Sequence, residues 1–370
     1  MVSMTRRVVR ERQSGIELLR IISMWMIVAH HLVEKNAFNV FAQPTGVRKA
    51  FFEIVFFAGG KIGVVVFFTI TAWFFLDREQ TFRASLRRVW LMERELLFWS
   101  IVLCAAFIVF ARPMMTSGSV VKSVFPLLFG LWWYPTSYAL FLVLLPFLQK
   151  GLRALDIGEH RALALSIVVL WGVVGLVPKT HMNDNVSGVF AFCFLYVIIA
   201  YYKWHCGNGW SRRAAWLMIV AGYALIAGYW MVFSLVWSRT GRFESLITMG
   251  ANDWKLGPVL VAFGLFILFE RMRFRSRVIN YLAGSAFAVY LISMYPQVVD
   301  LLWHRMFDLS HYYASPWSPL IAVGVVSAIY VVCTVMDMVR RALFAMTVDR
   351  NRGRLFDRAY ALCVEDRHGR

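Results

Sequence analysis

About ten apolar runs that suit membrane-spanning helices, some of them short, dominate this sequence. The runs lie near residues 15–34, 61–76, 95–112, 132–149, 162–178, 188–202, 213–236, 256–270, 278–299 and 317–339. Hydrophobic residues make up 60% of the chain and charged residues only 16%, whereas soluble domains carry about 25% charged residues. So few charges do not cover a soluble surface. We therefore predict an all-α, polytopic bundle of membrane helices.

The basic residues divide unevenly between the segments that connect these runs. A net charge of +18 would suggest nucleic-acid binding in a soluble protein, but here the charges form short clusters beside apolar runs. If the N-terminus is cytoplasmic, 27 of the 39 Lys and Arg residues fall on the inner side and 11 on the outer side, with Arg20 inside the first run. This bias predicts ten spans, both termini in the cytoplasm, and a multi-pass protein of the cell membrane that binds lipid and no nucleic acid.

We predict one membrane domain over residues 1–345 and a basic cytoplasmic tail over residues 346–370. The N-terminus has no small-x-small cleavage site after its apolar run, so we expect an uncleaved first helix. Residues 47–60 are expected to form an amphipathic or re-entrant piece before the second span, and residues 120–131 are a second candidate for such a piece. The five scattered cysteines indicate neither a disulfide framework nor a metal site. Because the connecting loops are short, the membrane helices and these loops must carry any chemistry.

The first run, GIELLRIISMWMIVAHH, places four ionisable residues in or beside a membrane span: Glu17, Arg20, His30 and His31. A charged side chain at mid-span costs about 2.5–3.5 kcal/mol on insertion scales, so such residues are functional candidates. Glu17 and Arg20 can alternatively pair at the inner interface, with the histidines as a polar helix end. His31 follows Arg20 by eleven residues, which gives an angular offset of about 20° and an axial separation of about 16 Å, whereas His30 lies about 100° from His31. A phosphate-bearing cofactor with a long arm would fit between Arg20 and His31.

These residues resemble acyltransferase family 3, whose polytopic members acylate hydroxyl groups of cell-surface glycans. The first helix of that family carries an Arg, ten residues and then a His, which Arg20 and His31 match. The segments GKIGVVVFFTITAWFFL (60–76), FPLLFGLWWYPTSYALFLVLLPFL (125–148) and LAGSAFAVYLISMYP (282–296) are similar to three further family segments. Thr71-Ala72 replaces the usual Ser-Gly, and Ser293 replaces an expected His.

The resemblance implies an O-acyltransferase in which His31 is catalytic and Arg20 and Glu17 orient the donor or the histidine. His31 would act as a general base or form an acyl-imidazole, because imidazole titrates near pH 6.5. The donor would be acetyl-CoA or another short acyl-CoA, the acceptor a surface or lipid-linked glycan, and no metal is expected.

Two groups of residues are predicted to bind the substrates. Arg87 and Arg88 suit the phosphates of coenzyme A because a guanidinium binds them with two hydrogen bonds, although positive-inside topology and lipid contact also explain this basic loop. Trp133, Tyr138 and Lys61 are the predicted substrate-binding residues, although aromatic clusters are also typical of membrane interfaces. Outer-loop residues such as Asp300 and His304 fit either glycan contact or a solvated loop. The alternative function is a transporter or flippase for a lipid-linked glycan, in which the intramembrane Arg and His carry substrate or protons.

Overall fold

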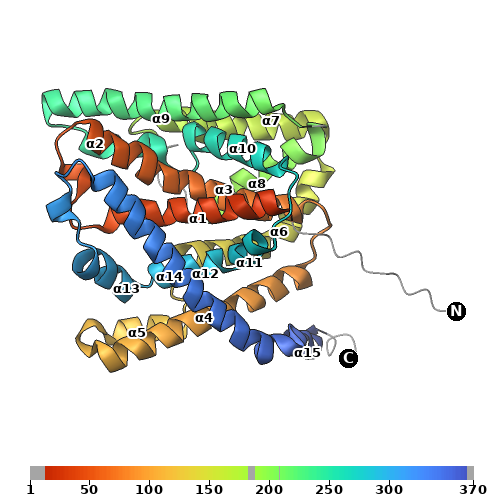
Figure 1. The fold of residues 1–370 in the computed structure, drawn as a ribbon. Coiled ribbons are helices and arrows are strands. Elements are labelled where there is room, and N and C mark those ends of the chain that lie inside the picture. The colour runs from red at the N-terminus through yellow and green to blue at the C-terminus, as the bar shows by residue number, and fades with distance from the viewer. Residues whose placement is uncertain (1–12, 182–187, 208, 365–370) are drawn as a thin grey trace.

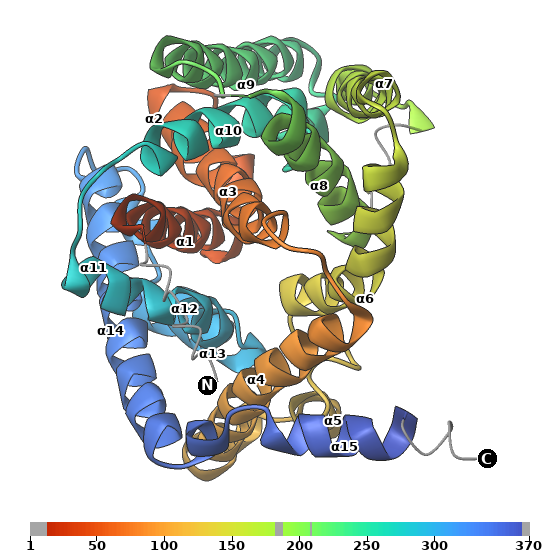
Figure 2. The same ribbon diagram turned by 90° about the vertical axis from the view of Figure 1, so that its right-hand side faces the viewer.

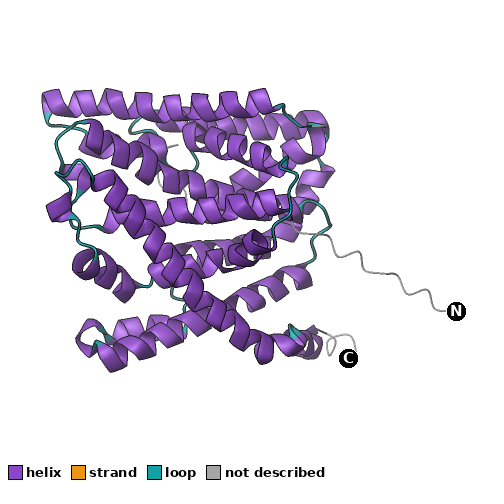
Figure 3. Ribbon diagram, viewed as in Figure 1, coloured by secondary structure: helices purple, strands orange, loops and turns teal. Residues whose placement is uncertain are grey.

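The computed structural model describes residues 13–181, 188–207 and 209–364, and within these ranges the chain forms helices and no strands. The arginines at positions 6, 7, 10 and 12, which contribute to the charge count, lie outside the described residues. Figures 1 and 3 show the helices packed as one bundle. The α-helices are α1 (Ser14–Lys35), α2 (Val47–Ala50), α3 (Ala58–Phe75), α4 (Phe82–Phe110), α5 (Ser117–Val124), α6 (Trp133–Ala154), α7 (Ile157–Ile167), α8 (Gly188–His205), α9 (Arg212–Thr240), α10 (Leu256–Glu270), α11 (Arg277–Leu282), α12 (Ala286–Ser293), α13 (Pro296–Asp300), α14 (Ser318–Met346) and α15 (Arg354–Val364).

Each predicted apolar run coincides with helix, but fewer helices than ten are long and apolar enough to cross a membrane. In the described parts of the chain seven helices meet that condition, and a pair bent by 80°, Arg277–Ser293 with Pro296–Met306, raises the number to eight. The two other predicted spans correspond to α4 and α6, which are long enough but contain more polar residues. The structure therefore supports a polytopic helical membrane protein with seven or eight such helices, and the ten-span count stays a prediction.

Helices α1 and α3 lie at the centre of the bundle, surrounded by the others (Figure 2). Buried residues make up 67% of the apolar stretch of α1 and 72% of that of Val47–Phe75, compared with 17% for α9 and 28% for α14. Protein therefore surrounds α1, whereas α9 and α14 present most of their apolar side chains to the outside. This position explains how α1 accommodates ionisable residues that a lipid-facing helix would not tolerate.

Two ends of the bundle are named here for reference (Figure 1). The proximal end, where α1 begins and α15 lies, is the predicted cytoplasmic end. The distal end, where α1 ends and where α2, α5 and α13 lie, is the predicted outer end. The described part of the predicted tail contains helix α15, which packs against α4 through Phe356 and Trp90, whose ring centroids are 6.4 Å apart.

The predicted re-entrant piece at residues 47–60 is wrong, because this segment continues into α3 without a break. A π-helical segment, Phe51–Phe57, joins α2 to α3, and together they form one 29-residue span, Val47–Phe75. The two charged residues of this segment are buried together, with Lys49 Nζ 4.0 Å from a Glu53 carboxylate oxygen. Trp230 of α9 donates its indole N–H to the same carboxylate.

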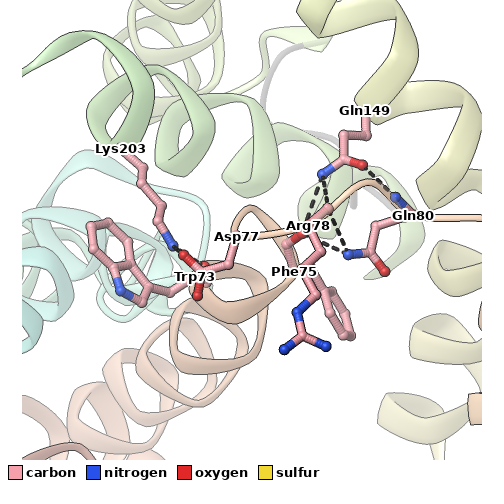
Figure 4. Close-up of polar contacts among 7 residues, drawn as sticks. All are labelled: Trp73, Phe75, Asp77, Arg78, Gln80, Gln149 and Lys203. Carbon is pink, nitrogen blue, oxygen red and sulfur yellow. Dashed lines mark hydrogen bonds and ion pairs between the residues drawn. The ribbon is translucent and has the colours of Figure 1, made fainter. Parts of the chain in front are cut away.

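The turn that follows α3 at the proximal end is held by side chains from α6 and α8 (Figure 4). The Gln149 amide donates to the carbonyl oxygens of Phe75 and Arg78 at 3.2 and 3.1 Å, and it accepts from the Gln80 backbone N–H at 2.8 Å. Lys203 of α8 donates to the Trp73 carbonyl and pairs with Asp77. These bonds fix the direction in which the chain leaves α3 and enters the arginine-rich start of α4.

Candidate functional site

A cavity of about 180 Å³ opens between α1, α3, α6 and α12, close to the distal end of the bundle. His31 lies on its wall, four residues before the end of α1, and is 7% exposed. The charged and polar or aromatic side chains that line the cavity are His30, His31, Glu34, Lys35, Lys61, Phe67, Trp133, Tyr134, Phe287 and Tyr290. Elements far apart in the sequence thus converge on the histidine that the Arg-x10-His spacing indicates.

The close approach of α1 and α3 depends on two glycines of α3. A Cβ atom on Gly60 would lie 2.1 Å from the Cβ of His30, and one on Gly63 would lie 2.6 Å from the Ser23 carbonyl oxygen. Real Cβ atoms essentially never approach this closely, so any larger residue would push the two helices apart. The Gly-x-x-Gly pattern therefore has a packing role here, because it brings α3 against the histidine-bearing turn of α1.

The two adjacent histidines have different partners. His30 Nδ1 is 2.8 Å from the Phe57 carbonyl oxygen, so this nitrogen carries the proton and donates it to the carbonyl. The His30 Nε2 atom is 3.6 Å from the Glu34 carboxylate. In contrast, His31 Nδ1 is buried and has no hydrogen-bond partner in the described part of the chain. A buried polar atom without a partner is costly, and at a site of reaction it is the kind of atom that a substrate proton satisfies.

Arg20 and Glu17 lie on the proximal half of α1 and form an ion pair, with 3.2 Å between Arg20 Nε and a Glu17 oxygen. The Arg20 guanidinium carbon is also 5.8 Å from the centroid of the Phe67 ring. Phe67 lines the His31 cavity, whereas Arg20 does not. The structure therefore places the two residues of the motif on one continuous helix, with the Phe67 ring between the guanidinium and the cavity.

Arg87 and Arg88 of α4 are neighbours in sequence but have separate surroundings. Arg87 lies 3.7 Å from the Asp357 carboxylate and donates to the Arg352 carbonyl at 3.0 Å, so it contacts the C-terminal segment. The Arg88 guanidinium lies 4.7 Å from the centroid of the Phe75 ring, and its Nη1 atom is buried without a partner among the described residues. The two arginines do not form one guanidinium cluster, as a joint phosphate site would require.

The three predicted substrate-binding residues are placed differently. Trp133 and Lys61 line the cavity, and the Lys61 Nζ atom is 5.9 Å from the centroid of the Phe57 ring. Tyr138 is outside the lining and stacks on Tyr134, with 6.0 Å between the ring centroids. Tyr138 therefore supports a wall of the cavity through Tyr134.

The sequence analysis did not identify several residues that build the cavity. Tyr134 and Tyr290 line it, and their rings are 6.3 Å apart, while Tyr290 lies 6.2 Å from His31. Glu34 was also missed, although its place four residues after His30 puts both side chains on one face of the helix. The two tyrosines lie in family-like segments, but nothing in the local pattern indicates that they meet.

A bundle of apolar helices that holds a histidine cavity within its helical core defines an integral membrane protein with an internal polar site. A family model described as an acyltransferase domain matches residues 13–337, which is most of the chain. The chain belongs to this family, acyltransferase family 3, as the Arg-x10-His spacing indicated. No curated protein and no solved structure matches the chain significantly. Family membership favours a membrane acyltransferase over the transporter alternative.

Proposed function

We propose that this protein moves a short acyl group, acetyl in the simplest case, from acyl-CoA to a hydroxyl of a cell-surface or lipid-linked glycan, and that it does so in the plasma membrane. The single observation that carries the proposal is the buried, partnerless Nδ1 of His31 beside a cavity in a member of an acyltransferase family. An imidazole nitrogen that no protein group occupies is available to accept a proton from a hydroxyl.

In this mechanism an acceptor hydroxyl enters the cavity from the distal side and His31 takes its proton. The hydroxyl oxygen forms a bond to the acyl carbonyl carbon, the carbon–sulfur bond of the thioester breaks, and the thiolate takes the proton from the imidazolium. Lys61 supplies a positive charge at the cavity wall, where the carbonyl oxygen gains negative charge in the transition state. The His30–Phe57 hydrogen bond holds the adjoining turn of α1 in place.

The donor approaches from the proximal end, so that the phosphates of coenzyme A stay near α4 and only the thioester arm reaches inward. Arg20 lies along this route and Glu17 orients it through their ion pair. Because the Phe67 ring stands between Arg20 and the cavity, the ring must turn aside when the arm enters.

The test compares His31→Ala with His30→Ala in the full-length protein reconstituted in lipid nanodiscs. Transfer of the radioactive acetyl group from labelled acetyl-CoA is measured on water-soluble and lipid-linked glycan fractions from cells that produce the protein. His31→Ala is expected to reduce transfer by about 10²- to 10⁴-fold, the usual contribution of a general base. His30→Ala is expected to cause a smaller loss, because its ring is held by the protein and does not carry the free nitrogen.

Binding of labelled coenzyme A provides the control, since both variants should retain it. Equal losses of transfer in the two variants would contradict the assignment of the base to His31. Full transfer by His31→Ala would refute the mechanism.

A further inference from the structure

Two more cavities lie at the distal end, outside the histidine cavity. One has a volume of about 490 Å³ and lies between the end of α4 and α13, and the other, of about 250 Å³, lies between α5 and α13. Pro296 and Gln297 line both, so the two form one outer groove divided at α13. The larger volume falls within the range of about 300–1,000 Å³ that is typical of small-molecule sites.

Gln297 is the central polar group of this groove and is only 7% exposed. Its amide nitrogen donates to the Ser119 hydroxyl at 3.0 Å and to the Met114 carbonyl at 3.4 Å. Its amide oxygen is buried and has no partner within the described chain. A buried acceptor left without a donor is unfavourable, so the oxygen indicates a missing hydroxyl or N–H group in the groove.

The outer groove adjoins the His31 cavity. Leu131 lines the groove and Trp133 lines the cavity, and Pro296 lines the groove while Met294 lines the cavity. In each segment a single residue intervenes, so the two linings are at most about 7 Å apart along the backbone.

The intervening residues, Trp132 and Tyr295, form a thin wall between the two spaces. Both are buried, and their ring centroids are 6.3 Å apart. The Trp132 indole N–H is a second buried polar group without a partner among the described residues. Only the Trp132 and Tyr295 side chains would therefore separate a ligand in the groove from the His31 cavity.

The chemistry of the groove favours a ligand rich in hydroxyl groups. Ser119 and Thr116 supply hydroxyl groups and Gln297 supplies an amide. The Asp300 carboxylate, which lines the larger cavity, is paired with Arg305 at 3.3 Å. Asp300 is also paired with His304 at 3.2 Å. Lys122 adds one positive charge to the lining of the smaller cavity. A sugar hydroxyl both donates and accepts hydrogen bonds, so it matches the hydroxyls and the amide of the groove. Apolar residues such as Phe110 and Pro113 offer surfaces for the C–H faces of a sugar ring.

We propose that this groove binds the carbohydrate acceptor and directs one of its hydroxyls past Trp132 and Tyr295 toward His31. The proposal rests on the proposed function for its direction, because it names where the acceptor of that reaction is held. The observation that carries it is the orphan amide oxygen of Gln297 in a groove that adjoins the histidine cavity.

Direct binding of glycan, without any acyl donor, tests the proposal. Tritium-labelled glycans from the water-soluble and the lipid-linked fractions are bound separately to the full-length protein in nanodiscs, which distinguishes the two sources of acceptor. Gln297→Leu is expected to raise the half-saturating concentration about tenfold, which corresponds to about 1.4 kcal/mol for a lost hydrogen bond.

A second variant removes no hydrogen-bonding side chain and instead fills the groove. Gly118 lines the smaller cavity, and a Cβ atom there would meet only the Thr116 hydroxyl at 3.9 Å, so Gly118→Trp fills the groove without disturbing the helix. The matched control is Gly46→Trp, at an exposed distal glycine that has no atom within 4 Å of an added Cβ. Binding should weaken in Gly118→Trp and stay unchanged in Gly46→Trp.

His31→Ala separates this proposal from the proposed function, since it should lose acyl transfer and keep glycan binding. Unchanged glycan binding in both Gln297→Leu and Gly118→Trp, or absence of binding to the unaltered protein, would overturn the groove assignment. If the groove variants weaken glycan binding but the unaltered protein transfers no acyl group, only the proposed function is overturned.

Discussion

At the scale of single residues, two neighbouring residues on one helix can have different contacts. Arg87 turns to the C-terminal segment and Arg88 turns to the end of α3, where its Nη1 atom is buried and unpartnered. Likewise His30 is bound to the Phe57 carbonyl, whereas the Nδ1 of His31 is unoccupied. In each pair one residue is engaged by another protein group, and the residue with an unpartnered nitrogen is the better candidate for contact with a substrate.

We predict that Arg88→Ala weakens binding of coenzyme A more than Arg87→Ala does. A charge-assisted hydrogen bond contributes about 1.5–3 kcal/mol, so the loss at Arg88 should be about tenfold or more. Equilibrium binding of labelled coenzyme A to the protein in nanodiscs measures both variants. Asp357→Asn serves as the control, because it frees Arg87 from its acidic partner without touching Arg88. A larger loss in Arg87→Ala would show that the phosphates bind nearer to the tail.

The sequence identified His31, Lys61 and Trp133, and the structure places all three at one cavity. Spacing along a single helix and a family-like pattern were sufficient for these residues. The contact between Arg87 and Asp357 was beyond such reasoning, since the two positions are 270 residues apart and no local pattern links them. Gln297 was not predicted for a similar reason, because the sequence does not show that its amide oxygen is buried without a partner.

At the scale of elements, the crossing of α1 and α3 decides whether the histidine cavity exists. Gly60 lies directly against His30, and Gly63 lies against the backbone of α1. The sequence showed the glycines but described the segment before them wrongly. Nothing in the local pattern indicates that Lys49 pairs with Glu53 inside the bundle or that Trp230 donates a hydrogen bond to Glu53.

Gly60→Ala is expected to separate α1 from α3 and to lower both stability and acyl transfer. Overpacking of this kind costs about 1–3 kcal/mol, because the Cβ of His30 is fixed to the helix and does not move aside. Gly59→Ala is the matched control, since its Cβ would meet only the flexible end of Met26, at 3.7 Å. Thermal unfolding in detergent and the transfer assay measure the two variants. Equal melting temperatures for them would contradict the packing role of Gly60.

At the scale of the whole molecule, the number of membrane crossings depends on whether the two less apolar helices, α4 and α6, cross the membrane. The charge bias predicts that α4 and α6 cross the membrane, while length and composition single out only seven or eight helices in the described chain. Hydropathy identifies where helices lie, but it does not decide whether a helix with a charged half crosses or lies along the surface.

Labelling of introduced cysteines decides this question. Gly118→Cys lies beyond α4 and Ser211→Cys precedes α9, and both positions are exposed. If α6, α7 and α8 all cross, the two cysteines lie on opposite sides, and an impermeant thiol reagent applied to intact cells should label only Gly118→Cys. The exposed Cys363 is replaced by Ser in both variants to remove background labelling. Labelling of both positions from the same side would mean that one of these helices does not cross.

The Phe67 ring between Arg20 and the histidine cavity has a consequence for the cell as well as for the reaction. A membrane potential acts on each elementary charge with about 2.3 kcal/mol per 100 mV, so an open aqueous passage through the bundle would dissipate the ion gradients of its host. The buried Phe67 ring would obstruct such a passage, since it contacts Arg20 and lines the cavity. In the proposed reaction the thioester arm of the donor would occupy the same space, so that an acyl group could cross the membrane while ions could not.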